Sequence, residues 1–178
     1  REHIQTLRDK CLRTLNILKF LSNTTWGADR KSLLLLYRAL VRSKLDYGSI
    51  VYSSSRDSYL RPLTTIHNAG LRFSTGAFRT SPVLSIYVDS GEPPLSYRRD
   101  ILMCSYVAKI LATKNHPCFN LIFNPRFKEL FNRRTKATKP LSIRFNLFFL
   151  GTGLRLPDVY PVDTRVTQRG LFRHRTSI

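Results

Sequence analysis

Apolar residues recur at spacings of three and four along the N-terminal two thirds of this chain, and this periodicity limits the possible folds more than any other feature. The clearest example contains Ile4, Leu7, Cys11, Leu15, Leu18 and Leu21. On an α-helix such residues share one face, which other elements must cover. Similar segments follow with short connections. The pattern therefore predicts an all-α fold, a small bundle of about five helices, rather than alternating strands and helices.

Capping residues and helix breakers divide this region into segments. The first helix should end near Ser22, and Asp29 is expected to cap a second helix that runs to about Asp46. Around Gly48 the sequence allows either a bend or a continuing helix, because glycine adopts both conformations. Both alternatives remain open at this point.

Three further helices are expected at about residues 58–75, 83–89 and 95–113. Asp57 can cap the third helix, and Gly76 should end it. Ser81–Pro82 supplies an N-cap and a first-turn proline for the fourth helix. Pro93–Pro94 forms a stiff elbow before the fifth, because proline fixes its own backbone and restricts the residue before it.

The periodicity is lost after residue 116. Residues 117–178 combine five prolines and several glycines with a surplus of Lys and Arg. We therefore expect a helical domain over 1–116 and, over 117–178, a basic tail that is mostly irregular and orders only against other parts of a larger protein. Since the chain begins at Arg1 without Met, we expect it to be a fragment.

The charge balance indicates the kind of partner. The chain has 30 Lys and Arg against 11 Asp and Glu, a net charge of +19. Such an excess repels itself in a compact fold, and a polyanionic partner that releases counterions on binding is the usual reason for it. Nucleic acid is the expected partner. A membrane is not, because no run approaches the roughly 20 apolar residues of a spanning helix.

The cysteines favour a reducing, intracellular compartment, without deciding between nucleus and cytoplasm. Cys11, Cys104 and Cys118 are odd in number and widely spaced, with no C-x-x-C pair. They suggest neither a disulfide framework nor a zinc site. No cofactor is expected in this chain.

No catalytic site is expected either. Asp89, with Glu129 and Asp158, superficially resembles the acids of a ribonuclease H domain. Asp89, however, lies at the end of a predicted short helix rather than in a strand, and no dense carboxylate cluster is present, as a two-metal site requires. His67 lies on a predicted helix face, where a lone histidine usually packs or bonds a backbone carbonyl.

Basic residues on the predicted helices are the best candidates for a functional site. We expect them to share one positive surface that tracks a phosphate backbone. They are Arg38, Arg42, Lys44, Arg72, Arg79, Arg98 and Arg99. Interleaved aromatic residues could stack on bases or sugars. They are Tyr47, Tyr52, Phe73 and Phe78. For each residue alone, a solvated face or a core position is the simpler interpretation.

Several of these segments occur in an order that resembles a known family. They are WGADR (26–30), LYRALVRSKLDYG (36–48), IHNAGLR (66–72), GAFRTSP (76–82) and GEPPL (91–95), followed by Arg98–Arg99. Over roughly residues 1–116 the chain resembles the region that follows the reverse transcriptase domain in jockey-like non-LTR retrotransposons.

The resemblance implies a thumb and connector segment of an RNA-directed DNA polymerase. Such a segment helps to hold the template-primer duplex, an RNA–DNA hybrid, while the palm, which carries the catalytic aspartates, performs synthesis. The palm lies upstream in that family, and a ribonuclease H domain often follows. Residues 117–178 depart from the pattern, because they carry none of the strand acids of a ribonuclease H domain.

Two alternatives remain. The chain could be a structural packing module that docks on the polymerase palm through an apolar face without binding nucleic acid itself. It could also be a free-standing nucleic-acid-binding protein, which the missing Met and the resemblance disfavour.

Overall fold

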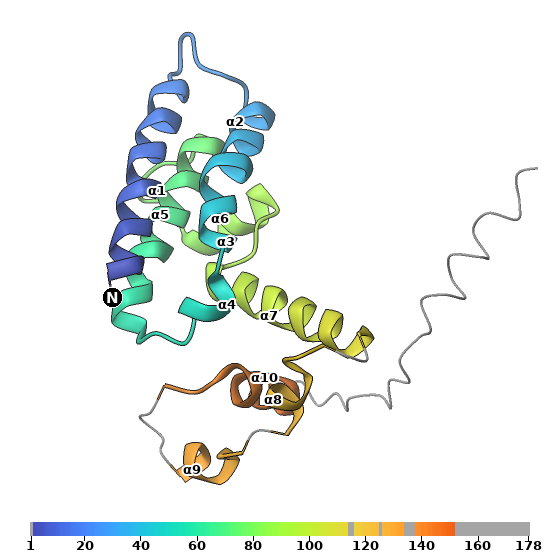
Figure 1. The fold of residues 1–178 in the computed structure, drawn as a ribbon. Coiled ribbons are helices and arrows are strands. Elements are labelled where there is room, and N and C mark those ends of the chain that lie inside the picture. The colour runs from blue at the N-terminus through green and yellow to red at the C-terminus, as the bar shows by residue number, and fades with distance from the viewer. Residues whose placement is uncertain (1, 114–115, 125, 134–137, 152–178) are drawn as a thin grey trace, which may run out of the picture.

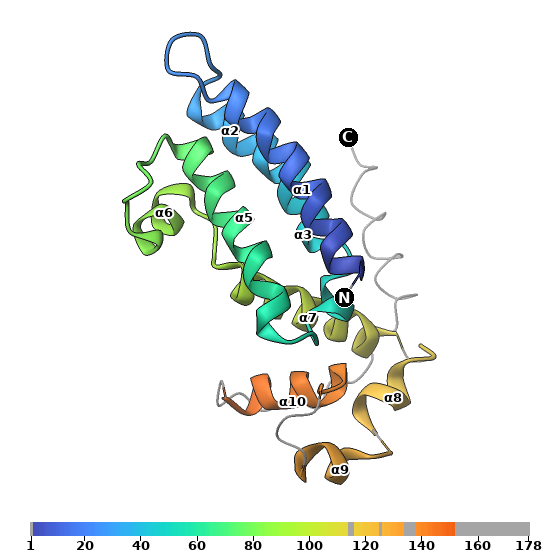
Figure 2. The same cartoon turned by 90° about the vertical axis from the view of Figure 1, so that its left-hand side faces the viewer.

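The computed structural model describes residues 2–113, 116–124, 126–133 and 138–151 of the 178. Every regular element in these ranges is a helix, so the predicted all-α fold is confirmed. The elements are α1 (Glu2–Leu21), α2 (Arg30–Tyr37), η1 (Arg38–Arg42), α3 (Ser43–Asp46), α4 (Ser49–Tyr52), α5 (Asp57–Thr75), α6 (Val83–Ser90), α7 (Leu95–Ala112), α8 (Phe119–Phe123), α9 (Lys128–Arg133) and α10 (Leu141–Gly151). Figure 1 and Figure 2 show α1, α5 and the rod of α2 and α3 side by side, with α7 leading away to the C-terminal helices.

The core of the bundle is built from one apolar stripe on each long helix. Of the residues that predicted the first helix, Leu21 at its end is half-buried and the other five are buried. The five are Ile4, Leu7, Cys11, Leu15 and Leu18. They pack against buried apolar residues of α5 and of the rod formed by α2, η1 and α3, which we call the second rod. Because fully burying one such aliphatic side chain is worth roughly 1.5–3 kcal/mol, this shared stripe is the main source of the stability of the bundle.

The second predicted helix is one continuous rod made of α2, η1 and α3. In η1 the N–H of Ser43 donates to the carbonyl of Arg38, five residues earlier, so this segment is a wide π-helical turn. The rod ends before Gly48, which has a φ of +66° in the left-handed region that glycine adopts at little cost. The chain therefore bends at Gly48 and restarts as α4, which resolves the alternatives left open by the sequence.

Several helix ends lie where the sequence predicted them. The carboxylate of Asp29 accepts hydrogen bonds from the N–H groups of Lys31 and Ser32, at 3.0 and 3.3 Å, and so caps α2. Gly76 ends α5 and Gly91 ends α6, both with left-handed backbones.

The fourth helix starts at Val83 as predicted, but the predicted capping residues of α5 and α6 were wrong by one position. Arg56, not Asp57, precedes α5, and Pro82, not Ser81, precedes α6. Both preceding residues have extended backbones with ψ of 145° and 136°, and neither offers a side-chain cap. Asp57 instead acts as an acidic residue in the first turn of α5, where the helix dipole favours negative charge.

The chain beyond residue 117 contains more helix than the irregular tail that the sequence predicted. Ile122 of α8 and Phe145 of α10 pack with Met103, Val107 and Ile110 of α7 in a second apolar cluster. Helices of five to eleven residues in a stretch without apolar periodicity were not recognisable. Residues 152–178, the rest of the predicted tail, lie outside the described residues.

Gly70 allows α5 to approach the second rod closely. A Cβ atom at this position would lie 2.7 and 2.8 Å from two ring carbons of Tyr37, closer than any normal contact. Tyr37 is fully buried and cannot move aside easily. The absence of a side chain at Gly70 is thus a packing requirement.

We expect Gly70→Ala to destabilise the protein by about 1–3 kcal/mol, because overpacking at a buried ring outweighs the better helix propensity of Ala. Urea unfolding followed by circular dichroism measures this change. Thr65→Ala, at an exposed position of α5, is the control and should change stability by under about 0.5 kcal/mol. A more stable Gly70→Ala variant would contradict the close packing.

Candidate functional site

The seven basic residues predicted as a nucleic-acid site occupy three different environments. Some take part in ion pairs, some donate hydrogen bonds to uncharged groups, and Arg99 is buried. Among the seven residues, only Arg79 is exposed rather than half-buried or buried. The structure therefore does not bring all seven side chains onto one open face.

The first environment is centred on Glu92, whose side chain is almost completely buried. Its carboxylate accepts hydrogen bonds from Nε of Arg38 at 2.6 Å and from Nη1 of Arg42 at 2.7 Å. Gly91 turns the chain at the end of α6, and the backbone N–H of Glu92 donates to the carbonyl of Tyr87 at 3.2 Å. Glu92 thus ties the connection between α6 and α7 to the second rod.

The pKa of Glu92 reflects this arrangement. Burial alone would raise the pKa of the carboxyl, but the hydrogen bonds and charges of Arg42 and Arg38 outweigh it and hold the pKa below its usual value. The carboxylate is consequently ionised at neutral pH and neutralises part of the positive charge of η1.

A second carboxylate extends the network to α7. Asp46, at the end of α3, accepts hydrogen bonds from Nη2 and Nε of Arg98 at 2.8 and 3.2 Å, and it lies 3.9 Å from Nε of Arg42. The bond to Asp46 is the main reason why the pKa of Arg98 is raised. Together, Arg38, Arg42, Asp46, Glu92 and Arg98 form what we call the clamp network, and its three arginines have structural partners.

The remaining candidates are arranged separately. Lys44 donates to the hydroxyl of Thr14 at 2.5 Å, and so joins α3 to α1. Arg72 donates to the carbonyl of Ser81 at 3.4 Å. Both residues are half-buried, and neither partner carries a negative charge that would neutralise the cation.

The four aromatic candidates also separate. Tyr47 and Phe78 are largely exposed, so both remain available for stacking. Tyr52, in contrast, is buried, and its hydroxyl donates to the carbonyl of Leu45, while Phe73 packs against the core. For Tyr52 and Phe73 the core position, the simpler interpretation in the sequence, is the observed one.

The exposed side of α1 presents a basic and aromatic face that the sequence analysis did not select. Thr6, Lys10, Arg13, Ile17 and Phe20 are all exposed and follow one another at spacings of three and four. We call this surface the α1 outer face. The same periodicity that identified the buried stripe of the helix could have identified it.

An aromatic pair continues the α1 outer face at the tip of the α1–α2 hairpin. The rings of Phe20 and Trp26 meet edge to face with centroids 4.8 Å apart, yet both side chains are more than half exposed. Lys19 and Arg30, on the two sides of this hairpin, are also exposed. The tip therefore combines positive charge with accessible ring faces.

The described residues offer no group of three or more His, Cys, Asp or Glu that could hold a metal ion. Asp89 is exposed and lies 3.7 Å from Arg30, while Glu92 is held by the clamp network. Asp158 lies outside the described residues. None of the described helices is both long and apolar enough to span a bilayer.

Comparison with known proteins found no match: no family model, no curated protein and no solved structure aligns with the chain.

The clamp network gives a direct prediction. We expect Glu92→Gln to lower the free energy of unfolding by about 2 kcal/mol, because charge-assisted hydrogen bonds to Arg38 and Arg42 are lost. Chemical denaturation measures the change. Asp89→Asn is the matched control, since its partner Arg30 is exposed and such surface pairs contribute at most about 1 kcal/mol. Equal effects of the two substitutions would show that the buried network has no special role.

His67 lies in the core next to Tyr37. The Tyr37 hydroxyl and Nδ1 of His67 share a hydrogen bond of 2.5 Å. Burial is the main reason why the pKa of His67 falls from 6.5 to about 4, although Glu92 and the Pro93 carbonyl act in the opposite direction. His67 is therefore neutral at pH 7, in keeping with a packing role.

Since the unfolded chain binds a proton at His67 more readily, we expect stability to fall as the pH drops from about 6.5 to about 4. The loss should reach roughly 2–3 kcal/mol over this window. Urea unfolding at pH 7, 5.5 and 4.5 measures it. His67→Asn should flatten this part of the profile, whereas His3→Asn, at an exposed position, should leave it unchanged. An unaltered slope in His67→Asn would assign the effect to other groups.

Proposed function

We propose that this chain is a non-catalytic part of an RNA-directed DNA polymerase that holds the template-primer duplex. The observation that carries the proposal is the net charge of +19, together with the way in which the carboxylates are used. Glu92 and Asp46 are committed to Arg38, Arg42 and Arg98, so they do not balance the basic residues exposed elsewhere. A surface with such an excess attracts a phosphate backbone without reading its sequence.

Because the arginines of the clamp network already have carboxylate partners, we place the proposed contact with the nucleic acid elsewhere on the molecule. The α1 outer face and the hairpin tip supply exposed cations, Lys10, Arg13 and Lys19, beside the rings of Phe20 and Trp26. Basic side chains that follow a backbone and aromatic rings that accept stacked bases or sugars are the combination used on non-specific nucleic-acid surfaces. Arg79 remains a separate contributor at the end of α5.

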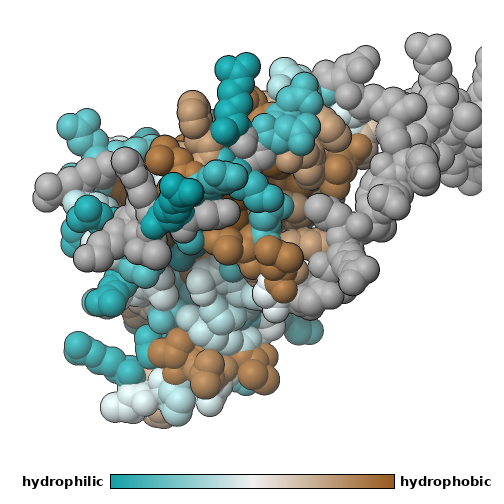
Figure 3. All heavy atoms as spheres, turned by 90° about the horizontal axis from the view of Figure 1, so that it is seen from below, coloured by the Kyte–Doolittle hydropathy of each residue, from teal (hydrophilic) through white to brown (hydrophobic). Residues whose placement is uncertain are grey.

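One observation favours a second candidate function, that of a packing module which docks on the polymerase palm. Apolar side chains are exposed on the C-terminal helices, and Figure 3 shows apolar surface gathered on this side of the molecule. They are Leu121, Phe127, Leu130, Leu147 and Leu150. Exposed apolar patches of this kind commonly mark protein contacts.

We expect the purified chain to bind a labelled RNA–DNA hybrid with an affinity that falls steeply with salt. Replacing Lys10, Arg13 and Lys19 together by Gln should weaken binding and reduce the logarithmic salt slope by about 2–3, because each lost phosphate contact removes roughly 0.9. Fluorescence anisotropy between 50 and 200 mM salt measures both. Arg56, Arg61 and Lys109, changed together to Gln, form a control of equal charge on exposed positions elsewhere.

The outcomes separate the two candidates. Equal losses in the two triple variants would show that binding depends on net charge and not on the α1 outer face and the hairpin tip. Affinity that is negligible, or flat with salt, would contradict the nucleic-acid function. The packing module would then be favoured if the chain also binds a hydrophobic dye strongly and Leu121→Ser with Leu150→Ser weakens that signal.

A further inference from the structure

A small, open cavity with both polar and apolar side chains in its wall lies where the α4–α5 connection, the start of α7 and helix α10 meet. Its volume is about 310 Å³. The polar side chains in its wall come from these separate parts of the chain. They are Ser53, Asp57, Ser96, Arg99, Asp100 and Arg144. No residue of the clamp network lines this cavity, so the clamp network does not account for the charged side chains in its wall.

Arg99 is the unexplained group in this cavity. It is only 9% exposed, and its Nη1 atom is completely buried without a hydrogen-bond partner. No ion pair or hydrogen bond reaches its guanidinium from any described residue. A buried cation without a partner is costly, because the loss of hydration is not compensated. Asp100 and Asp57 lie close enough to act on its charge, but neither carboxylate accepts a hydrogen bond from it.

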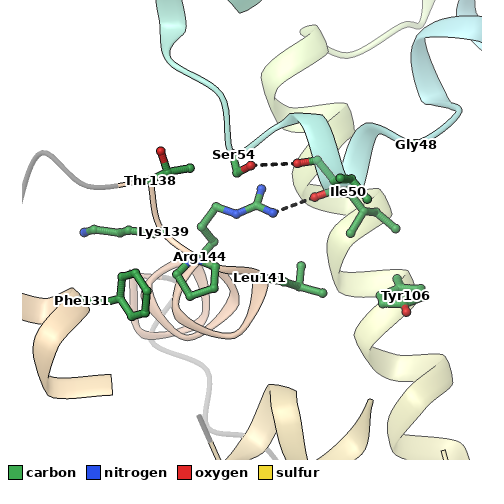
Figure 4. A pocket seen from close by; sticks show the side chains of 11 residues that line it. Gly48, Ile50, Ser54, Tyr106, Phe131, Thr138, Lys139, Leu141 and Arg144 are labelled. Atoms are coloured by element: carbon green, nitrogen blue, oxygen red, sulfur yellow. Dashed lines mark hydrogen bonds between the residues drawn. The ribbon is translucent and has the colours of Figure 1, made fainter. Parts of the chain in front are cut away.

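Arg144 places a second guanidinium at the wall of the same cavity. Its Nη2 donates to the carbonyl of Ile50 at 2.7 Å, as Figure 4 shows, and its Nη1 donates to the hydroxyl of Ser53. These bonds fix the plane of the group, while Nε remains buried without a partner. On its other side Arg144 lines a larger, mainly apolar pocket with Ile50 and Leu141. Arg144 is therefore held in place before any ligand arrives.

Two carboxylates line the cavity as well, and they limit the charge that it can accept. Asp57 and Asp100 both attract Arg99 electrostatically, but neither forms an ion pair with it among the described residues. Burial raises the pKa of Asp100, although Arg99 and Arg144 counteract this. Two cations and two acids leave room for a ligand that carries both negative charge and a hydroxyl group, since the hydroxyl can donate to a carboxylate.

We propose that this cavity binds a phosphate-type oxyanion between Arg99 and Arg144. Planar guanidinium groups match the oxygens of phosphate, and charge-assisted bonds of this kind are the strong ones. A protonated inorganic phosphate or phosphate monoester would donate its hydroxyl to Asp100 or Asp57 while the arginines bind its other oxygens. The proposal rests on the proposed function only in suggesting the terminal phosphate monoester of a nucleic-acid strand as the natural source, since an internal phosphodiester has no hydroxyl to donate.

Inorganic phosphate is the probe, titrated by calorimetry into the full chain at constant ionic strength with chloride as the comparison anion. We expect saturable binding that Arg99→Gln weakens at least tenfold. Asp100→Asn should tighten binding several-fold, because it removes a negative charge from the wall while the amide oxygen can still accept the hydroxyl of the phosphate. A variant that merely folds badly could not bind more tightly, so this second change keeps the test valid. Lys31→Gln, distant at the start of α2, should bind as the parent does.

Absence of saturable phosphate binding, or equal binding by the parent, Arg99→Gln and Asp100→Asn, would overturn the proposal. Hybrid binding by the same variants separates it from the proposed function. If phosphate binds at Arg99 but the Arg99→Gln chain holds the hybrid as tightly as the parent, the cavity is a phosphate site outside the duplex grip. If hybrid binding fails while phosphate binding remains, the cavity is supported and the duplex-holding function is not.

Discussion

The bond between Glu92 and two arginines of η1 is the interaction on which the arrangement of this molecule depends. It fixes the connection between α6 and α7 against the second rod, and Asp46 then secures the first turns of α7 through Arg98. Since α7 carries the second apolar cluster, the position of α8 and α10 follows from these few charges. An ion-pair network of this kind is directional, so it specifies how α7 leaves the bundle, which apolar packing alone would specify less strictly.

The local parts of the fold could be predicted from the sequence, and the partnerships between distant residues could not. The stripe of α1 and the cap at Asp29 depend on neighbours within a few positions. The use of Arg38 and Arg42 depends on Glu92, some fifty residues away, and no local rule couples them. The sequence shows that Lys10 and Arg13 are polar residues of α1, but it does not mark them as candidates for a site. They become candidates because the structure pairs Arg38 and Arg42 with a buried carboxylate.

Arginine thus has different uses in one basic chain. In the clamp network it neutralises buried carboxylates, at the cavity beside α10 it lacks a partner, and on exposed faces it is solvated. Net charge, which first suggested a polyanionic partner, does not distinguish these environments. Burial and partners do, and they reduce seven candidates to a smaller set with free charge.

The π-helical turn in η1 has a consequence for how this region tolerates change in length. Tyr37, Val41 and Leu45 are spaced by four and all face the core, a spacing that would drift around a regular helix of 3.6 residues per turn. The wider turn absorbs that drift. Loss of one residue between 38 and 42 would convert this turn into a regular helical turn, and the residues after it would keep nearly the same direction, because the wide turn closes with one more residue than an α turn. Asp46 would still face Arg98, so this segment can lose one residue and keep its connection to α7.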